Sequence, residues 1–477
     1  MPQGMGNMLG MSVIAILMSG LIYATLTWPQ SWDQLHFSVD GTFPHGRTKN
    51  RCFLLCRAGL LVLIMLMGSR NVFAYSVLTH EEIVDLVWTS NIRPLLLHRF
   101  PDLTEDQIKE AHAYAYGGSA IQDLGYYPFG SKDFSDLVHY VRSGDFVLEM
   151  LSQSQDANEY AFALGALSHY TADIAGHPAV NAAVSMHYPK LRAKYGKSVR
   201  YAQDTSAHLK TEFGFDTLQV AKNRYAPEQF HDFIGFKVSV PLLERTFPVV
   251  YGLKLKDVLA HQDMAIGSYR FAVSQLIPEM TRVALQTHKK DLMRETPNFA
   301  RRKFLYHLSR SDYQKEWGKT YDIPGLGTRI LAGLLRYIPK VGPFKGLGFD
   351  NPTPKTEDLY IKSINTTVVQ YCVYLEEVRA GTLALPNRDL DDGAMTAAAE
   401  YTLADKTYAN LLVKLSANKF VETSPQLRDN ILDFYSDLSL PIETKMDASR
   451  WQGVLADLSQ LKSASLPLVA ATPAPDL

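Results

Sequence analysis

The sequence lacks an excess of charge of either sign. Lysine and arginine together number 48 against 49 aspartates and glutamates, which gives a formal net charge of −1 at pH 7. A protein without a strong overall field does not attract a polyanion over a distance, so nucleic-acid binding would need a local basic patch. No long run of basic residues is present. We therefore expect no nucleic-acid partner.

The sequence also lacks β-type alternation of useful length and any internal repeat. Hydrophobic residues make up 46% of the chain and charged residues 20%, which is the composition of a folded globular protein. Apolar residues recur at a spacing of three to four, as in Ile83, Leu86, Val87 and Ile92, which is typical of an amphipathic helix. We predict an all-α fold made of many helices.

Cysteine is scarce. Of three cysteines, Cys52 and Cys56 fall in a segment that we expect to be removed, which leaves Cys372 alone in the mature chain. One cysteine permits neither an intramolecular disulfide nor a cysteine-rich zinc site. Any metal ion must then be held by histidine, aspartate and glutamate.

The expected leader covers residues 1–74. Its second apolar stretch, Ala58 to Met67, is too short to span a bilayer but suits the hydrophobic region of a secretory signal peptide, and several basic residues precede it. Val72-Phe73-Ala74 suits a cleavage site, which makes Tyr75 the first mature residue and predicts an exported, periplasmic or secreted protein. In the alternative, Met8 to Trp28 is a true membrane span, which is long enough to anchor the chain.

Breaks in the helical pattern divide the rest of the chain. Glycines and prolines cluster at 338–354, and the last residues are rich in alanine and proline. We expect four parts after the leader: a catalytic domain at 75–225, a helical extension at 226–340, a C-terminal helical region at 341–465 and a disordered tail at 466–477.

Two helices and one loop are predicted within the catalytic part. Thr104, followed by Gln107 at the third position, predicts a capped start for a helix from Glu105 to Tyr116. A loop rich in glycine, tyrosine and proline follows from Gly117 to Ser135. Small and apolar residues predict a closely packed helix from Asn158 to Ala175.

The strongest metal-binding motif is His169-x3-Asp173-x3-His177. On a helix, steps of four residues keep side chains on one face, so the carboxylate would stand between the two imidazoles. Pro178 disfavours helical geometry at the preceding residue and predicts that the helix ends near His177. In the alternative interpretation these are polar residues on a solvated face, but the apolar residues before His169 indicate burial, where polar groups need partners.

Five further residues join the candidate set. His208 and Glu212 again share a helix face, although a hydrogen-bonded surface pair often has this spacing. His80, Asp123 and His139 are each unremarkable alone, as a helix-start histidine, a turn aspartate and a half-buried core histidine. Their occurrence together in one helical region favours a metal site.

This set of motifs resembles the zinc-dependent phospholipase C family, over about residues 75 to 215. The local sequence is most similar to the N-terminal domain of glycosylphosphatidylinositol-specific phospholipase D and its bacterial relatives, in Thr79-His80-Glu-Glu-Ile83, Gly165-Ala-Leu-Ser-His169 and Ala207-His208-x3-Glu212-Phe-Gly. The secreted bacterial phospholipases and fungal single-strand nucleases have a longer spacing than the three residues between Asp173 and His177. This difference favours the phospholipase D-like branch.

The resemblance implies a cluster of up to three zinc ions. It assigns one ion to Asp123, His139, His169 and Asp173, and a second ion to His177, His208 and Glu212. The third would be held by His80, by Asp173 as a bridge, and by the amino group and carbonyl of Tyr75, so that export would be coupled to activity.

The resemblance further implies hydrolysis of a phosphodiester in a phospholipid or glycolipid, of C or D type, at a membrane surface. Asp123 would act as the catalytic base for a metal-activated water. The loop from Tyr126 to Gly130 would line the headgroup pocket or touch the membrane, unless its aromatic residues only pack in the core. The alternatives are a nuclease-like phosphoesterase acting on single strands and a secreted helical module that binds zinc or membrane without turnover.

Overall fold

The computed structural model describes residues 77–127, 129–222, 224–225, 234–273, 277, 281, 349 and 351–464. These residues form helices and contain no strand, and the one β contact among them is an isolated bridge between Arg388 and Met395. The prediction of an all-α fold is confirmed. The predicted leader, Tyr75 and the tail lie outside the described residues, as does most of 226–340.

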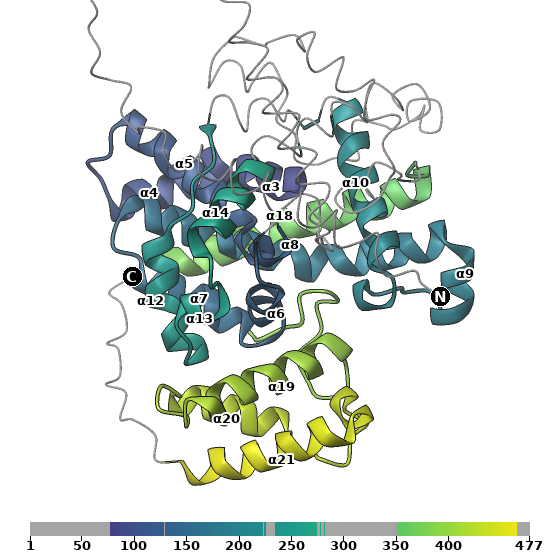
Figure 1. The fold of residues 1–477 in the computed structure, drawn as a ribbon. Coiled ribbons are helices and arrows are strands. Elements are labelled where there is room, and N and C mark those ends of the chain that lie inside the picture. The colour runs from purple at the N-terminus through teal and green to yellow at the C-terminus, as the bar shows by residue number, and fades with distance from the viewer. Residues whose placement is uncertain are drawn as a thin grey trace, which may run out of the picture. The chain divides into compact units, whose positions relative to one another are not determined.

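Helix α8, Ala157–His187, is the central element (Figure 1). It begins at Asp156, whose side chain accepts a hydrogen bond from the Glu159 amide and so satisfies one of the free N–H groups of the first turn. It packs most extensively against α5, Glu105–Ser119, and α18, Pro354–Ala380. Apolar residues on all sides allow this burial.

Two glycines set the distance between α5 and α8. A Cβ atom on Gly118 would lie 1.9 Å from the carbonyl oxygen of Phe162, and one on Gly165 would lie 2.1 Å from that of Ala115. Neither position can hold a larger side chain while the backbones stay this close. The close approach also brings Ser119, at the end of α5, beside the metal-binding motif of α8.

The other helices surround this pair. The N-terminal ones are α3 Val77–Val87, the π-helix η1 Trp88–Ile92, α4 Arg93–Arg99, the 3-10 helix η2 Ile121–Tyr126, α6 Lys132–Tyr140 and α7 Ser143–Gln153. After α8 come α9 Pro189–Tyr195, η3 Tyr201–Gln203, α10 Thr205–Ala221, α12 Val240–Tyr251, α13 Leu255–Val258 and α14 Gln262–Phe271. The C-terminal ones are α19 Thr402–Ala417, α20 Pro425–Phe434, η8 Glu443–Met446 and α21 Ala448–Ser463.

The described residues all belong to one compact unit, Val62–Leu477. Contacts cross the predicted boundaries, since α18 packs on α8 and α19 packs on α6. The division into parts at 225 and 340 stays a prediction. None of the described helices combines the length and apolar character needed to cross a bilayer, and the predicted span at 8–28 lies outside them.

Two local predictions need correction. The capping box at Thr104 is present, but α5 continues to Ser119, and the predicted loop contains η2 and the first turn of α6. Helix α8 does not end near His177 but continues through Pro178 to His187. The proline removes one intrahelical hydrogen bond, to the Ile174 carbonyl, and the burial of Val180, Ala183 and Val184 offsets this loss.

Candidate metal centre

The predicted donor side chains come from five elements and meet in the interior. Each one that the structure describes is only 0–2% exposed. Helix α3 supplies His80, η2 supplies Asp123 and α6 supplies His139, while α8 carries the three-residue motif and α10 carries the His–Glu pair, in full His80, Asp123, His139, His169, Asp173, His177, His208 and Glu212. The first and last of them, His80 and Glu212, are 132 positions apart, so the tertiary fold brings them together.

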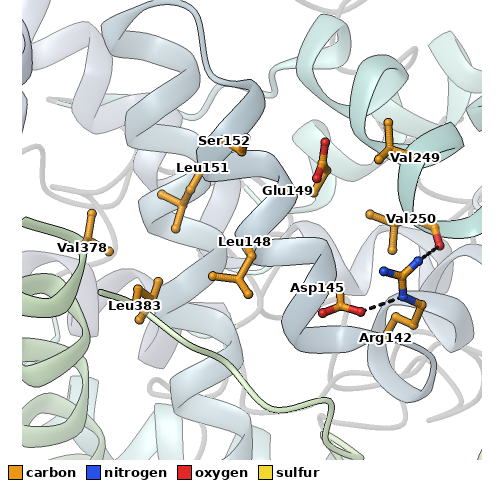
Figure 2. Close-up of a pocket in the computed structure, with 10 residues that line it drawn as sticks. All are labelled: Arg142, Asp145, Leu148, Glu149, Leu151, Ser152, Val249, Val250, Val378 and Leu383. Carbon is orange, nitrogen blue, oxygen red and sulfur yellow. Dashed lines mark hydrogen bonds and ion pairs between the residues drawn. The ribbon is translucent and has the colours of Figure 1, made fainter. Parts of the chain in front are cut away.

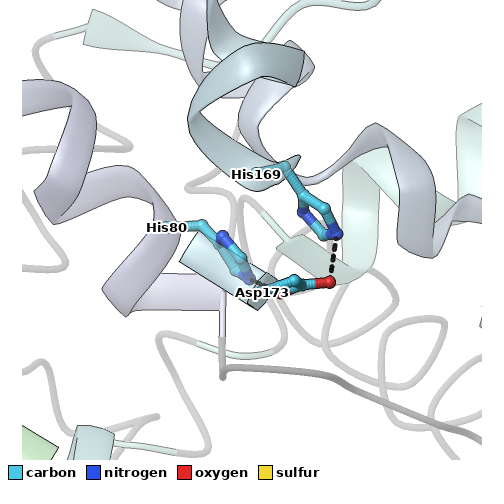
Figure 3. Close-up of side chains that lie close together, drawn as sticks. All are labelled: His80, His169 and Asp173. Atoms are coloured by element: carbon cyan, nitrogen blue, oxygen red, sulfur yellow. Dashed lines mark ion pairs between the residues drawn. The ribbon is translucent and has the colours of Figure 1, made fainter. Parts of the chain in front are cut away.

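Asp173 is the central group of this cluster. Its carboxylate oxygens lie 3.0 Å from Nε2 of His169, 3.6 Å from Nε2 of His139, 3.7 Å from Nε2 of His80 and 3.9 Å from Nε2 of His177. His80 and His169 stack at a centroid distance of 4.3 Å, and both rings point toward Asp173 (Figure 3). One carboxylate thus faces four imidazoles.

Two subsets are compact enough to share an ion. His80, His169 and Asp173 form one group, and Asp123, His139 and His169 form the other, with all donor atoms of a group within 4.8 Å of one another. Ligands about 2 Å from a tetrahedral zinc ion lie roughly 3.3 Å apart. The pairwise distances to Asp173 and the 3.5 Å between Asp123 Oδ1 and His139 Nε2 are close to this value.

Backbone carbonyls determine which ring nitrogen faces the centre. His139 Nδ1 lies 2.7 Å from the carbonyl oxygen of Ser135, and His169 Nδ1 lies 2.9 Å from that of Ser119. A carbonyl only accepts, so Nδ1 carries the hydrogen in both rings and donates it. Each neutral ring then directs the lone pair of Nε2 toward the carboxylates, which is the form that binds a metal ion.

The buried polar atoms at the centre fit a cation. Both oxygens of Asp123 and of Asp173, and Nε2 of His139 and of His169, make no hydrogen bond within the described part of the chain. Buried polar atoms of this kind are costly unless they are satisfied. A donor set of imidazole nitrogens and carboxylate oxygens suits zinc, and an ion among these atoms would satisfy them together.

Charges within the cluster shift its titration. Burial alone would lower the pKa of His139, but Asp123 and Asp173 raise that pKa well above its ordinary value. The pKa of His169 is also raised, because Asp173 outweighs the effect of burial. Conversely, His169 and His177 hold the pKa of Asp173 well below its ordinary value, although burial opposes this. Protons therefore compete with a metal ion for His139 and His169.

This competition predicts that zinc stabilises the protein more at higher pH. The charged imidazoles stabilise the metal-free protein below their ordinary pKa, and this contribution is lost as pH rises through the raised values. Zinc needs the neutral rings, so its stabilisation should grow over that same range. We expect the zinc-induced rise in Tm to be small near about pH 5.5 and larger near about pH 8, as thermal scans with and without zinc would measure. A rise that shrinks with pH would contradict this account.

The second predicted ligand set is less compact. His208 Nε2 donates to the Val199 carbonyl at 2.6 Å, and its Nδ1 lies 3.3 Å from Glu212 Oε1. Burial lowers the pKa of His208 and raises the pKa of Glu212, so burial opposes the charged form of both groups. The ring centroids of His177 and His208 are 6.5 Å apart, and His177, His208 and Glu212 are not among the compact donor groups of the described residues. His208 and Glu212 therefore lie near His177, but the three side chains do not form a compact group of ligands.

Sequence reasoning missed Asp391, in the loop between α18 and α19. Its Oδ1 lies 3.6 Å from Nδ1 of His177, and its side chain is buried. It lies far along the chain from the other acidic donors, in the part predicted only as a C-terminal helical region. The one sequence feature that marked it is the acidic run Asp389-Leu-Asp391-Asp392.

A surface pocket lies elsewhere, between α7, α12 and the end of α18 (Figure 2). It contains none of the predicted donors. Its one arginine, Arg142, already bonds Asp145 Oδ2 at 2.6 Å and the Val250 carbonyl at 2.7 Å. The buried cluster is the better candidate site, because several of its polar side-chain atoms make no hydrogen bond among the described residues and could bind a metal ion.

The aromatic loop after Asp123 is mostly core. Tyr126 and Tyr127 are 4% and 2% exposed, and Tyr127 packs edge-to-face on Tyr269. Phe129 is 45% exposed, with a positive φ of 63°. Core packing is therefore the better interpretation for the two tyrosines, whereas Phe129 faces solvent.

Comparison with known proteins gives one match. Residues 79–259 match the family model described as zinc dependent phospholipase C. The match contains every predicted donor except Tyr75, and it extends beyond the resemblance seen in the sequence to include α12 and α13. No curated protein and no solved structure matches the chain.

Proposed function

We propose that this chain, whose residues 79–259 match the zinc-dependent phospholipase C family, hydrolyses phosphodiester bonds of phospholipids at the buried His–Asp cluster. The observation that carries this proposal is the convergence of four imidazoles on the carboxylate of Asp173. A structural zinc site closes with four ligands around one ion, whereas this interior offers more donors than one ion uses.

We assign Asp123, His139, His169 and Asp173 to one ion, and His80 with Asp173 to another. Zinc held there would polarise phosphoryl oxygens and water. The fixed Nδ1–H bonds of His139 and His169 keep their Nε2 atoms in place, so little reorganisation accompanies binding. Asp123, whose two oxygens make no hydrogen bond among the described residues, is the group placed to accept a proton.

The finer assignments are proposals of the same kind. A further ion at His177, His208 and Glu212 would require these side chains to close around it. The terminal amino group of Tyr75 would complete the site of His80 once a leader is removed, so that activity would follow export. His80 lies in the first turn of α3, a few residues after Tyr75, so only a short stretch of chain would separate the two ligands.

Two other functions remain as outcomes of a test. A nuclease-like phosphoesterase would use the same donors on a single strand, but that reaction needs a basic groove with stacking aromatics. A protein without turnover would only bind zinc. A purely structural zinc site would not need the buried carboxylate of Asp123, whose oxygens make no hydrogen bond among the described residues.

Metal analysis combined with a substrate panel tests the proposal. The purified protein should contain more than one zinc ion and should release phosphate-containing headgroups or phosphatidic acid from phospholipid vesicles. A chelator should abolish this activity, and added zinc should restore it. Cleavage of single-stranded DNA but not of lipid would favour the nuclease reading, and zinc without turnover of either substrate would refute the enzymatic proposal.

A further inference from the structure

The loop between α18 and α19 reaches the metal centre from outside the family-matched segment. Tyr170 of α8 donates to the Pro386 carbonyl at 2.6 Å, and the Leu390 amide donates to the carbonyl of His139 at 3.2 Å. The Asn387 side chain accepts from the amides of Gly144 and Asp145 at the start of α7. The loop is therefore bonded to three helices that surround the centre.

The close approach of this loop to α8 depends on Gly393. Its φ is +74°, and a Cβ atom there would lie 2.4 Å from the carbonyl oxygen of Ile174. Only glycine fits such a position. That carbonyl lacks the usual helical partner because Pro178 has no N–H, so the loop backbone packs where α8 has lost a hydrogen bond.

Asp391 is held rigidly within this loop. Its Oδ2 accepts hydrogen bonds from the hydroxyls of Tyr140, at 2.9 Å, and Tyr401. Its backbone is fixed as well, because its amide donates to Asp389 Oδ1 at 2.9 Å and its carbonyl accepts from Asn181 Nδ2 at 3.0 Å. The other carboxylate oxygen, Oδ1, faces Nδ1 of His177 at 3.6 Å.

The imidazole of His177 thus stands between two carboxylates. Nδ1 faces Asp391, and Nε2 faces Asp173 Oδ1 at 3.9 Å. In His139 and His169, Nδ1 is bonded to a backbone carbonyl. In His177 the side chain of Asp391 takes the position that a carbonyl takes in His139 and His169.

We propose that Asp391 is a positioning residue for the metal centre, which holds Nδ1–H of His177 so that Nε2 presents its lone pair to the ion that we assign to His177, His208 and Glu212. Carboxylate partners of this kind orient a ligating imidazole and fix its tautomer. A shortening of the 3.6 Å separation to a hydrogen bond is part of this proposal. The inference rests on the proposed function, because it needs a metal ion at His177.

The test measures zinc affinity in Asp391→Asn by competition with a chromophoric chelator. The amide keeps the shape and can still accept from the two tyrosines, but it no longer offers a carboxylate to His177. We expect affinity for one ion to fall about 10- to 100-fold, the usual effect of losing such a partner. Asp392→Asn is the matched control: it removes the same charge from the same loop, where Asp392 pairs with Arg200 Nε at 3.2 Å, and should leave affinity unchanged.

A double-mutant cycle separates this role from loop stability. If Asp391 acts through His177, Asp391→Asn should cost little further affinity in a His177→Ala protein. The inference would be overturned if Asp391→Asn lowered zinc affinity equally in both backgrounds, or if Asp391→Asn bound zinc as tightly as the unaltered protein. In either case, zinc binding by the unaltered protein would leave the proposed function standing. A wild-type protein that binds no zinc would overturn both.

Discussion

Replacing Asp173 with alanine should remove zinc and activity together. The carboxylate faces His80, His139, His169 and His177 at 3.0–3.9 Å, more histidines than any other carboxylate pairs with among the described residues. A metal ion contributes several kcal/mol to catalysis, and each 1.4 kcal/mol is about tenfold in rate, so activity should fall by about 10³-fold or more. Metal analysis should show that more than one ion is lost.

A control on the same helix distinguishes this effect from damage to α8. Asp156 caps the N-terminus of α8 by accepting from the Glu159 amide at 2.9 Å. Asp156→Ala should cost about 1 kcal/mol of stability through the lost cap and should leave zinc content intact. An Asp173→Ala protein that keeps its full zinc content would show that the carboxylate does not bridge ions.

Replacing Gly165 with alanine should produce a large loss of stability. The added methyl would lie 2.1 Å from the carbonyl oxygen of Ala115 and 2.9 Å from the amide nitrogen of Ser119. Both are backbone atoms, so α5 and α8 must separate, at a cost of about 3 kcal/mol or more. Thermal unfolding should show a fall in Tm on the order of 10 °C.

The same change should weaken zinc binding, because it moves the Ser119 carbonyl that holds Nδ1 of His169. Gly453→Ala in α21 is the matched control. No atom lies within 4 Å of its added methyl, and alanine is the better helix former, so stability should rise by about 0.5–1 kcal/mol. Similar Tm values for the two variants would mean that the helices are less tightly packed than described.

The fold class and the pairing of His169 with Asp173 were predictable because both depend on short spacings. Steps of three and four residues predict helices, and the step from His169 to Asp173 places two donors on one face of a buried helix. The capping box at Thr104 was predictable for the same reason. Each of these patterns fits within two helical turns.

The parts that escaped prediction depend on tertiary contacts. Pro178 predicted a helix end, but buried residues on its far side keep α8 continuous to His187. Asp391 is 214 positions from His177, and its role follows only from a loop folded back on α8. Nothing local distinguishes it from Asp392, which lies next to it and pairs with Arg200 instead.

Helix α18 covers the helix that carries the central motif. Tyr371 donates to the Leu164 carbonyl at 2.8 Å, and Tyr360 contacts Thr79 beside His80, with both tyrosine rings almost fully buried. These residues lie more than 100 positions beyond the family-matched segment. The family-matched segment is therefore not expected to fold by itself. If the chain were cut after Leu259, a long apolar side of α8 would be exposed to water. A chimera built from this segment must include α18 as well.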